Sequence, residues 1–325
     1  MTPAKRLARF SLRLLLILAA IAPLAYAIYR EWPALRASIV GIDWGAMAGA
    51  ELMLISVMLL VVAVPWFSLQ SLGAQLSFIK VAGLYFASQV LKYLPGGFWA
   101  FPGRIAAYRV AGVGQAESIV SVFRETSALF LGAAAVGLYG VLQGLAVSNV
   151  VRTAITLGVL VSIIVILITQ LPWFWRFLSR FKFLQSSTVT AYEQVSQKGL
   201  SLVWFPQTFL ASVAFWLLLG LPFRQMATAV TPDAAALSWV DAASIFALAW
   251  CAGFVVVFIP AGIGIREGVL SILLSTVLPV GDALSLALIS RAAWILAEAF
   301  WILVTLLWWT RDADLSWESL RRNGP

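Results

Sequence analysis

The chain has 325 residues, of which 62% are hydrophobic and only 11% are charged, and its mean hydropathy is +0.95. Soluble domains carry far more charge, so this composition excludes a large soluble domain and predicts a polytopic membrane protein. Histidine is absent and cysteine occurs once, as Cys251, which excludes histidine acid–base catalysis, disulfides and thiolate metal clusters. We expect one membrane domain over residues 1–325, with no metal and no cofactor.

Six apolar runs are long enough to cross a bilayer, and we expect each to form a transmembrane helix. They cover residues 10–29, 45–68, 116–142, 150–171, 202–222 and 284–309. Tryptophan and tyrosine gather near their ends, as interfacial residues do. The net charge of +8 comes largely from basic residues near the ends of these runs. The positive-inside rule explains this charge without nucleic-acid binding.

Two further regions, residues 77–112 and 241–282, are apolar but interrupted by proline and glycine. The first contains "YLPGGFWAFPGR" and the second "PAGIG", and neither offers two spans of about 20 residues each. Treating each as a re-entrant hairpin places the basic, amphipathic connection 172–200 and both chain termini in the cytoplasm, as the positive-inside rule requires. We therefore predict an all-α protein with six full transmembrane helices and two re-entrant hairpins.

The two interrupted regions resemble each other. Downstream of the breaks, "GQAESIVSVFR" (114–124) aligns without gaps with "GDALSLALISR" (281–291) at four identical positions. We predict an internal repeat formed by residues 77–142 and 241–309, each a hairpin followed by a span. The predicted topology inserts the two hairpins from opposite sides of the membrane. Inverted repeats of this kind build transporter sites from broken helices near the midplane.

The segment "PAGIGIREG" in the second hairpin sets charge beside a broken backbone. Gly262 and Gly264 permit backbone angles closed to other residues and a close approach by a ligand. A helix that restarts after them would present its first N–H groups to an anion, with Arg266 beside them. We predict a lipid-phosphate site here, because the arginine fork suits phosphate oxygens. The alternative is a structural Arg266 that pairs with Glu298 or Glu125.

The first repeat offers further candidates for the phosphate site. Arg104 follows a Pro-Gly pair and is the best match there to Arg266. Lys92 and Arg109 are also candidates, although both side chains could instead extend to the membrane interface.

Two arginines, Arg124 and Arg291, lie within predicted spans. An unpaired charge at the bilayer centre costs from about 2.5 to more than 10 kcal/mol. Each arginine should therefore face the interior and meet an acid of the other repeat, in a functional or a purely structural pair. Glu51, alone in the second span, could balance an arginine or carry a proton. The expected charge partners are Glu267, Glu298, Glu125 and Glu51.

Two motif pairs carry a family resemblance: "YLPGGFWAFPGR" with "SVFRE", and "IPAGIGIREGVL" with "ISR". Over residues 10–310 the chain resembles the flippase-like transmembrane family, also called the lysylphosphatidylglycerol synthase transmembrane region and found in multiple peptide resistance factors. The resemblance implies a helical bundle with re-entrant segments that moves a lipid, often an aminoacylated or glycosylated one, across the membrane. The chain resembles a stand-alone member without the synthase domain, and its first motif departs from the family by the extension "FWAF".

These observations predict a lipid flippase, not an enzyme, in the cytoplasmic (inner) membrane of a prokaryote. It would work by alternating access around a midplane phosphate site. Two alternatives stay open: a membrane-embedded glycosyl- or acyl-transferase acting on lipid-linked substrates, and a non-catalytic partner of a lipid-synthesising enzyme. The lack of histidine and of an acid-rich metal motif disfavours the transferase. The expected partners are a membrane lipid, a lipid-synthesising enzyme and a second copy of the chain.

Overall fold

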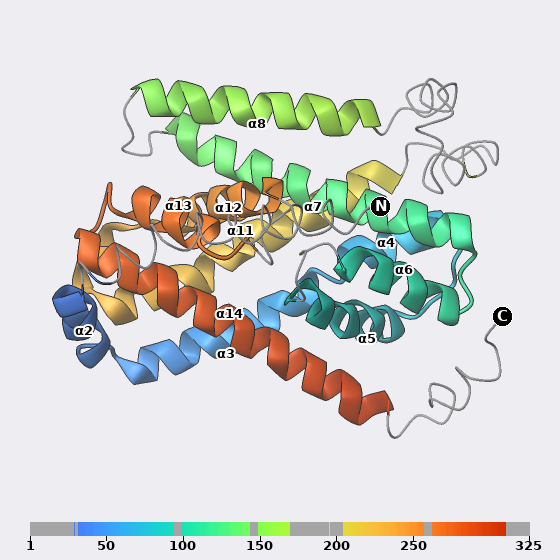
Figure 1. The fold of residues 1–325 in the computed structure, drawn as a ribbon, viewed down its shortest axis with the longest axis horizontal. Helices are drawn as coiled ribbons and strands as arrows, with labels where there is room; N and C mark the ends of the chain where they lie inside the picture. Colours follow the sequence, from blue (N-terminus) through green and yellow to red (C-terminus); the bar gives the residue numbers. More distant parts are fainter. Residues whose placement is uncertain are drawn as a thin grey trace, which may run out of the picture.

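The computed structural model describes residues 29, 32–93, 99–143, 149–169, 195, 204–256 and 262–309, and every element in these ranges is a helix (Figure 1). In chain order the helices are α2 (Trp32–Val40), α3 (Trp44–Leu60), α4 (Ala63–Ser71), α5 (Phe78–Gln89), η1 (Val90–Tyr93), α6 (Ala100–Val110), α7 (Gln115–Gln143), α8 (Asn149–Thr169), α11 (Trp204–Val230), η3 (Pro232–Ala236), α12 (Trp239–Val255), α13 (Ile265–Leu274) and α14 (Val280–Trp309). The predicted first span (10–29) and the basic connection (172–200) fall almost wholly outside the described residues.

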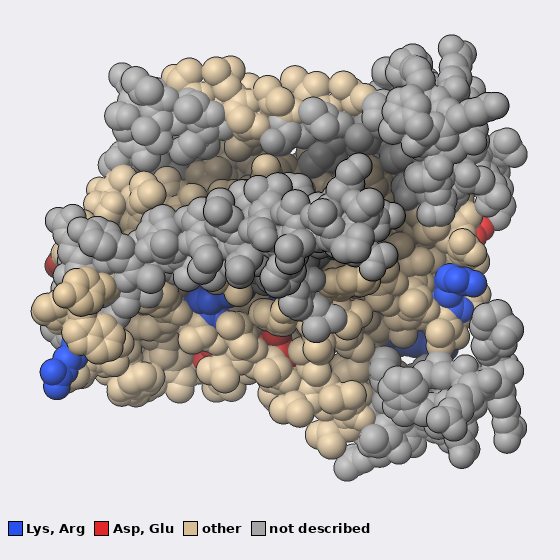
Figure 2. Space-filling model, viewed as in Figure 1, with Lys and Arg blue, Asp and Glu red and all other residues tan. Residues whose placement is uncertain are grey.

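Four helical segments are long and apolar enough to cross a membrane: Trp44–Ser71, Gln115–Gln143, Phe205–Val230 and Val280–Trp308. They fall on four of the predicted spans, and α8 is a helix over a fifth. Among the described residues on the face in Figure 2, blue and red are confined to a few small areas. The prediction of an all-α, membrane-embedded protein is confirmed at this level.

The predicted span 45–68 forms two helices, α3 and α4, because of a proline. Pro65 has no N–H to donate to the carbonyl of Val61, four residues back. The helix tightens just before it, where the N–H of Val64 reaches the Val61 carbonyl, three residues back, at 3.2 Å. The apolar run therefore continues, but its backbone hydrogen bonding changes at this point.

The predicted span 202–222 was too short, because α11 continues through Pro222 to Val230. The added residues include Arg224 and Gln225, polar groups that are costly in a membrane helix unless they are satisfied. Tertiary contacts satisfy these polar groups. Arg224 Nε donates to the Leu237 carbonyl at 2.7 Å, and Gln225 Nε2 donates to the Ala46 carbonyl of α3 at 3.2 Å.

Two parts of the chain share one order of elements. The first unit is α5, η1, α6 and α7; the second unit is α12, α13 and α14. Each unit begins at a serine whose hydroxyl accepts a backbone N–H: Ser77 from Lys80 at 3.3 Å and Ser238 from Asp241 at 3.1 Å. The short helices α5, α6, α12 and α13 have 12, 11, 17 and 10 residues, fewer than the roughly 20 needed to span. The breaks at 94–98 and 257–261 lie outside the described residues.

The two units pack against each other reciprocally. The first helix of each unit contacts the long helix of the other, α5 on α14 and α12 on α7. In the first unit α6 packs against both α5 and α7, and in the second unit α13 packs against both α12 and α14. Helix α11 joins the units to α3: it packs against α3, α7 and α12, and its Trp216 Nε1 donates to the Leu129 carbonyl of α7 at 2.9 Å. This arrangement positions the site between the units.

Candidate functional site

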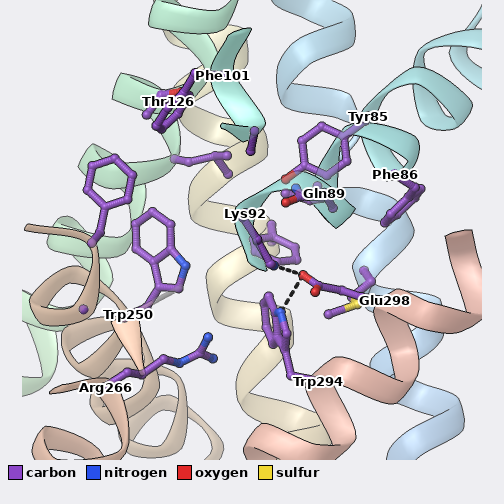
Figure 3. Close-up of a pocket in the computed structure, with 18 of the residues that line it drawn as sticks. Tyr85, Phe86, Gln89, Lys92, Phe101, Thr126, Trp250, Arg266, Trp294 and Glu298 are labelled. Atoms are coloured by element: carbon purple, nitrogen blue, oxygen red, sulfur yellow. Dashed lines mark hydrogen bonds and ion pairs between the residues drawn. The ribbon is translucent and has the colours of Figure 1, made fainter. Parts of the chain in front are cut away.

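A cavity of about 210 Å³ lies between the two units, and we name it the central cavity. Four of its lining side chains are cationic and one is acidic: Lys92, Arg104, Arg266, Arg291 and Glu298. Much of the remaining wall is aromatic, including Tyr85, Phe101, Phe215, Trp216, Trp250, Phe254 and Trp294 (Figure 3). The central cavity therefore combines buried positive charge with a wide apolar surface.

Arg104 enters the central cavity from α6 with its charge already balanced. Its Nη1 donates to Glu125 Oε1 of α7 at 2.6 Å, and its Nε donates to Ser88 Oγ at 3.0 Å. Tyr108 donates its hydroxyl to Glu125 Oε2 at 2.9 Å, and the guanidinium lies over the Tyr85 ring at 4.0 Å. These contacts fix the orientation of Arg104. Because its guanidinium is already paired with Glu125, Arg104 is less available to bind a phosphate than predicted.

Lys92 and Glu298 form the ion pair that joins the two units across the central cavity (Figure 3). Glu298 also accepts the Tyr93 hydroxyl at 2.6 Å and the Trp294 Nε1–H at 2.7 Å. Lys92 and Tyr93 stand on η1, whereas Glu298 and Trp294 stand one helical turn apart on α14. The carboxylate is thus held by one cation and two neutral donors.

Arg291 pairs with Glu267 of its own unit, with Nε 3.5 Å from Oε1. The prediction that its acid would come from the other repeat is wrong for this pair, because α13 and α14 pack directly together. Glu267 Oε2 also accepts the Gly264 N–H at 2.7 Å, at the start of α13. We expected the first N–H groups of this helix to meet an anion. One of them is instead satisfied by the helix's own glutamate.

Arg266 is buried, with 6% of its surface exposed, and it stands in a different environment from the other three cations. Its guanidinium lies 4.5 Å from the Phe246 ring centre and 4.7 Å from that of Trp294. Among the described residues it forms no ion pair, because Glu298 and Glu125, the acids of the structural alternative, are committed to Lys92 and Arg104. Arg266 is thus held by aromatic faces and opens onto the central cavity.

Gly262 and Gly264 have φ angles of 67° and 88°, in the left-handed region that favours glycine. At Gly262 the structure shows a close approach to another helix, and the predicted approach of a ligand stays a prediction. A Cβ at Gly262 would lie 3.0 Å from the Cα and carbonyl oxygen of Gly253 in α12. The two glycines therefore let the chain cross α12 closely and turn into α13, which places Arg266 at the central cavity.

We expect Gly262→Ala to destabilise the protein by at least about 1–3 kcal/mol, since it combines a left-handed backbone with a backbone clash. The matched control is Gly268→Ala, six residues on in α13, where a Cβ would meet nothing within 4 Å. That change should leave stability equal or raise it by about 0.5–1 kcal/mol, because glycine weakens a helix. Thermal unfolding in detergent measures both. Equal melting temperatures for the two variants would contradict the close crossing.

The other predicted site residues lie elsewhere. Arg109 is exposed at the end of α6, outside the central cavity. Arg124 is buried in α7, where Nη1 donates to Ser71 Oγ of α4 at 3.3 Å, and it does not line the central cavity. Glu51 is half-buried on α3 and also lies off the cavity wall. Of the predicted phosphate-binding residues, the central cavity brings together Lys92, Arg104, Gly262, Arg266 and Arg291.

Sequence reasoning missed the aromatic and hydroxyl partners of these charges. Trp294 had a usable signal, because it lies four residues before Glu298 and therefore shares its helix face. Tyr93 adjoins Lys92 but carries no periodic signal on its short 3-10 turn. The Phe246 ring centre on α12 lies 4.5 Å from the Arg266 guanidinium on α13, and no spacing in the sequence indicates that contact.

The fold and the central cavity define an all-helical, membrane-embedded protein with a buried cationic site between two similarly ordered units. No protein-family model matches the chain, and no curated protein matches it. Within the described ranges, no three histidine, cysteine or acidic side chains gather where they could hold a metal ion. The function is therefore argued from the site itself.

Proposed function

We propose that this protein translocates an anionic membrane lipid between leaflets and binds the lipid phosphate at Arg266. The observation that supports this proposal is the charge arrangement of the central cavity. Four cations meet three acids, Glu125, Glu267 and Glu298, and each acid is paired with a cation other than Arg266. A buried cation without an anion is costly at membrane depth. A phosphate would supply that anion and accept the arginine fork.

The wall of the central cavity suits a lipid rather than a soluble anion. Trp250 and Phe254 stack with an interplanar angle of 18° on the second unit, and both line the central cavity. Such surfaces bury acyl chains while the arginine holds the headgroup. A membrane lipid unites these two chemistries in one molecule, whereas a free phosphate would leave the apolar wall in contact with water.

We propose that the two units form an inverted repeat and move by alternating access, with α5–α6 and α12–α13 as re-entrant hairpins. Their shared order of elements and reciprocal packing support this, because two-fold related units would contact each other in that way. In this proposal the chain lies in a prokaryotic cytoplasmic membrane with both termini in the cytoplasm. The resemblance to the flippase-like family suggests an aminoacylated or glycosylated lipid as the cargo.

The orientation is tested by single cysteines, Lys182→Cys and Asp233→Cys, each in a Cys251→Ser background. Cys251 is the single cysteine of the sequence, so its serine replacement removes any background labelling. Asp233 is exposed in η3, and residue 182 lies outside the described residues. We expect an impermeant thiol reagent to reach them from opposite sides of the membrane. Labelling of both from one side would contradict the inverted repeat.

Translocation is tested with purified protein in vesicles that contain a fluorescent phosphatidylglycerol. A membrane-impermeant quencher should bleach both leaflets in protein-containing vesicles and only the outer leaflet in protein-free ones. Fluorescent phosphatidylcholine, whose own quaternary ammonium offsets the phosphate charge and adds a cation to an already cationic site, should move much more slowly. If activated sugar or acyl donors yield a modified lipid while neither fluorescent lipid moves, the protein is a transferase instead.

A further inference from the structure

We propose that the Lys92–Glu298 ion pair is an exchangeable latch between the two units, opened when the lipid phosphate takes Lys92 from Glu298. The inference rests on the proposed function and adds how binding would be coupled to motion. It starts from the position of this pair. The pairs Arg104–Glu125 and Arg291–Glu267 each lie within one unit, whereas Lys92–Glu298 connects η1 of the first unit to α14 of the second.

Lys92 is suited to change partners, and Arg104 is not. The Lys92 side chain retains 19% exposure beside the central cavity, against 7% for Arg104. Lysine is a compact charge on a flexible stem, so it can follow an anion without a fixed fork geometry. Arg104 is held by Glu125, Ser88 and the face of Tyr85 together.

Glu298 is equally suited to release its cation. After Lys92 leaves, the carboxylate would still accept the Tyr93 hydroxyl and the Trp294 N–H, at 2.6 and 2.7 Å. Hydrogen bonds to a charged acceptor are stronger than neutral ones, so the acid is not stranded. Among the described residues, only the Tyr93 hydroxyl would then link Glu298 to the first unit, and the contact between the units would be weakened.

Arg266 would hold the incoming phosphate close to the Lys92–Glu298 pair. Trp294 lies under the Arg266 guanidinium at 4.7 Å and also donates to Glu298. Trp294 therefore contacts Arg266 directly and Lys92 through their shared partner Glu298, and both cations line the central cavity. Figure 3 shows Arg266 reaching toward Trp294 from the left, while Lys92 meets Glu298 above the Trp294 ring. A phosphate on Arg266 is placed to attract Lys92 and to relieve the repulsion between the two cations.

The test is a double-mutant cycle on the binding of phosphatidylglycerol in detergent. Glu298→Gln keeps the shape of the side chain but removes the charge that competes with the lipid phosphate for Lys92. We therefore expect the lipid to bind about tenfold more tightly, which corresponds to one charge-assisted hydrogen bond. In a Lys92→Met background, Glu298→Gln should tighten binding by less than about twofold. Asp233→Asn, a loss of the same charge on the exposed η3 turn, should leave affinity unchanged.

The cycle has clear contrary outcomes. If Glu298→Gln binds no more tightly than the wild type, no exchange takes place. If the tightening persists in the Lys92→Met background, the effect is general electrostatics and the latch is wrong. These binding results do not depend on transport. If the protein moves no lipid in vesicles, the proposed function is wrong. If it moves lipid but the double-mutant cycle shows no coupling between Lys92 and Glu298, only the latch is wrong.

A second measurement uses wild-type charges and stands even if Glu298→Gln does not fold. Spin labels at Ile79 of α5 and Leu303 of α14, both exposed, report the separation of helices that pack together. We expect phosphatidylglycerol, but not phosphatidylcholine, to broaden or lengthen the distance distribution. Glu298→Gln should show the altered distribution without lipid. An unchanged wild-type distribution at saturating phosphatidylglycerol would overturn the latch.

Discussion

Arg266→Ala is expected to abolish lipid transport while the protein stays folded. The guanidinium has no acid partner among the described residues, so its removal strands no carboxylate. What is lost is contact with Phe246 and Trp294, worth about 0.5–2 kcal/mol each. Release of a buried, uncompensated charge offsets part of that loss. The melting temperature should therefore change little.

Transport should fall much further, because the phosphate loses its only uncommitted cation in the described part of the central cavity. A charge-assisted hydrogen bond contributes about 1.5–3 kcal/mol, which corresponds to roughly a 10- to 150-fold loss of affinity. Arg266→Lys should restore transport only in part, since the charge returns without the planar fork. Vesicle transport and thermal unfolding are measured on the same preparations. A stable Arg266→Ala protein with full transport would contradict the phosphate site.

Arg104→Ala is expected to have the opposite signature, a large loss of stability. Glu125 is fully buried and would keep only the Tyr108 hydroxyl after its cation is removed. Breaking a buried ion pair by removing one partner costs about 3–5 kcal/mol, because the remaining charge has nowhere to go. The two arginines make a matched comparison, since the same substitution is made in the corresponding short helix of each unit.

The double variant Arg104→Ala with Glu125→Gln decides whether the loss comes from the stranded acid. A neutral amide can still accept the Tyr108 hydroxyl, so we expect most of the lost stability to return. Thermal unfolding of the single and double variants provides the measurement. If Arg104→Ala unfolds at the wild-type temperature, the Arg104–Glu125 pair is not a structural anchor, and Arg104 returns to the set of phosphate ligands.

Several features of the fold could be predicted from the sequence. Apolar runs of sufficient length must form helices in a membrane, because the backbone has to satisfy its own hydrogen bonds there. The runs at 45–68, 116–142 and 284–309 accordingly became helical segments within a few residues of their predicted limits. Glycines beside a proline marked the break before α13, where Gly262 and Gly264 adopt positive φ. These are local properties, which neighbouring residues determine.

The sequence by itself thus determined the membrane class, the helices and the candidate cations, while only the tertiary structure decided which cations are neutralised. Lys92 and Glu298 are 206 residues apart, and Glu125 meets Arg104 rather than the adjacent Arg124. Helical periodicity shows which face a side chain shares but not what that face will meet. Ion pairing requires contact within a few ångströms, and the packing of distant helices sets those distances. For that reason the position of Arg266 over two aromatic rings, without an ion pair among the described residues, became visible only in the folded chain.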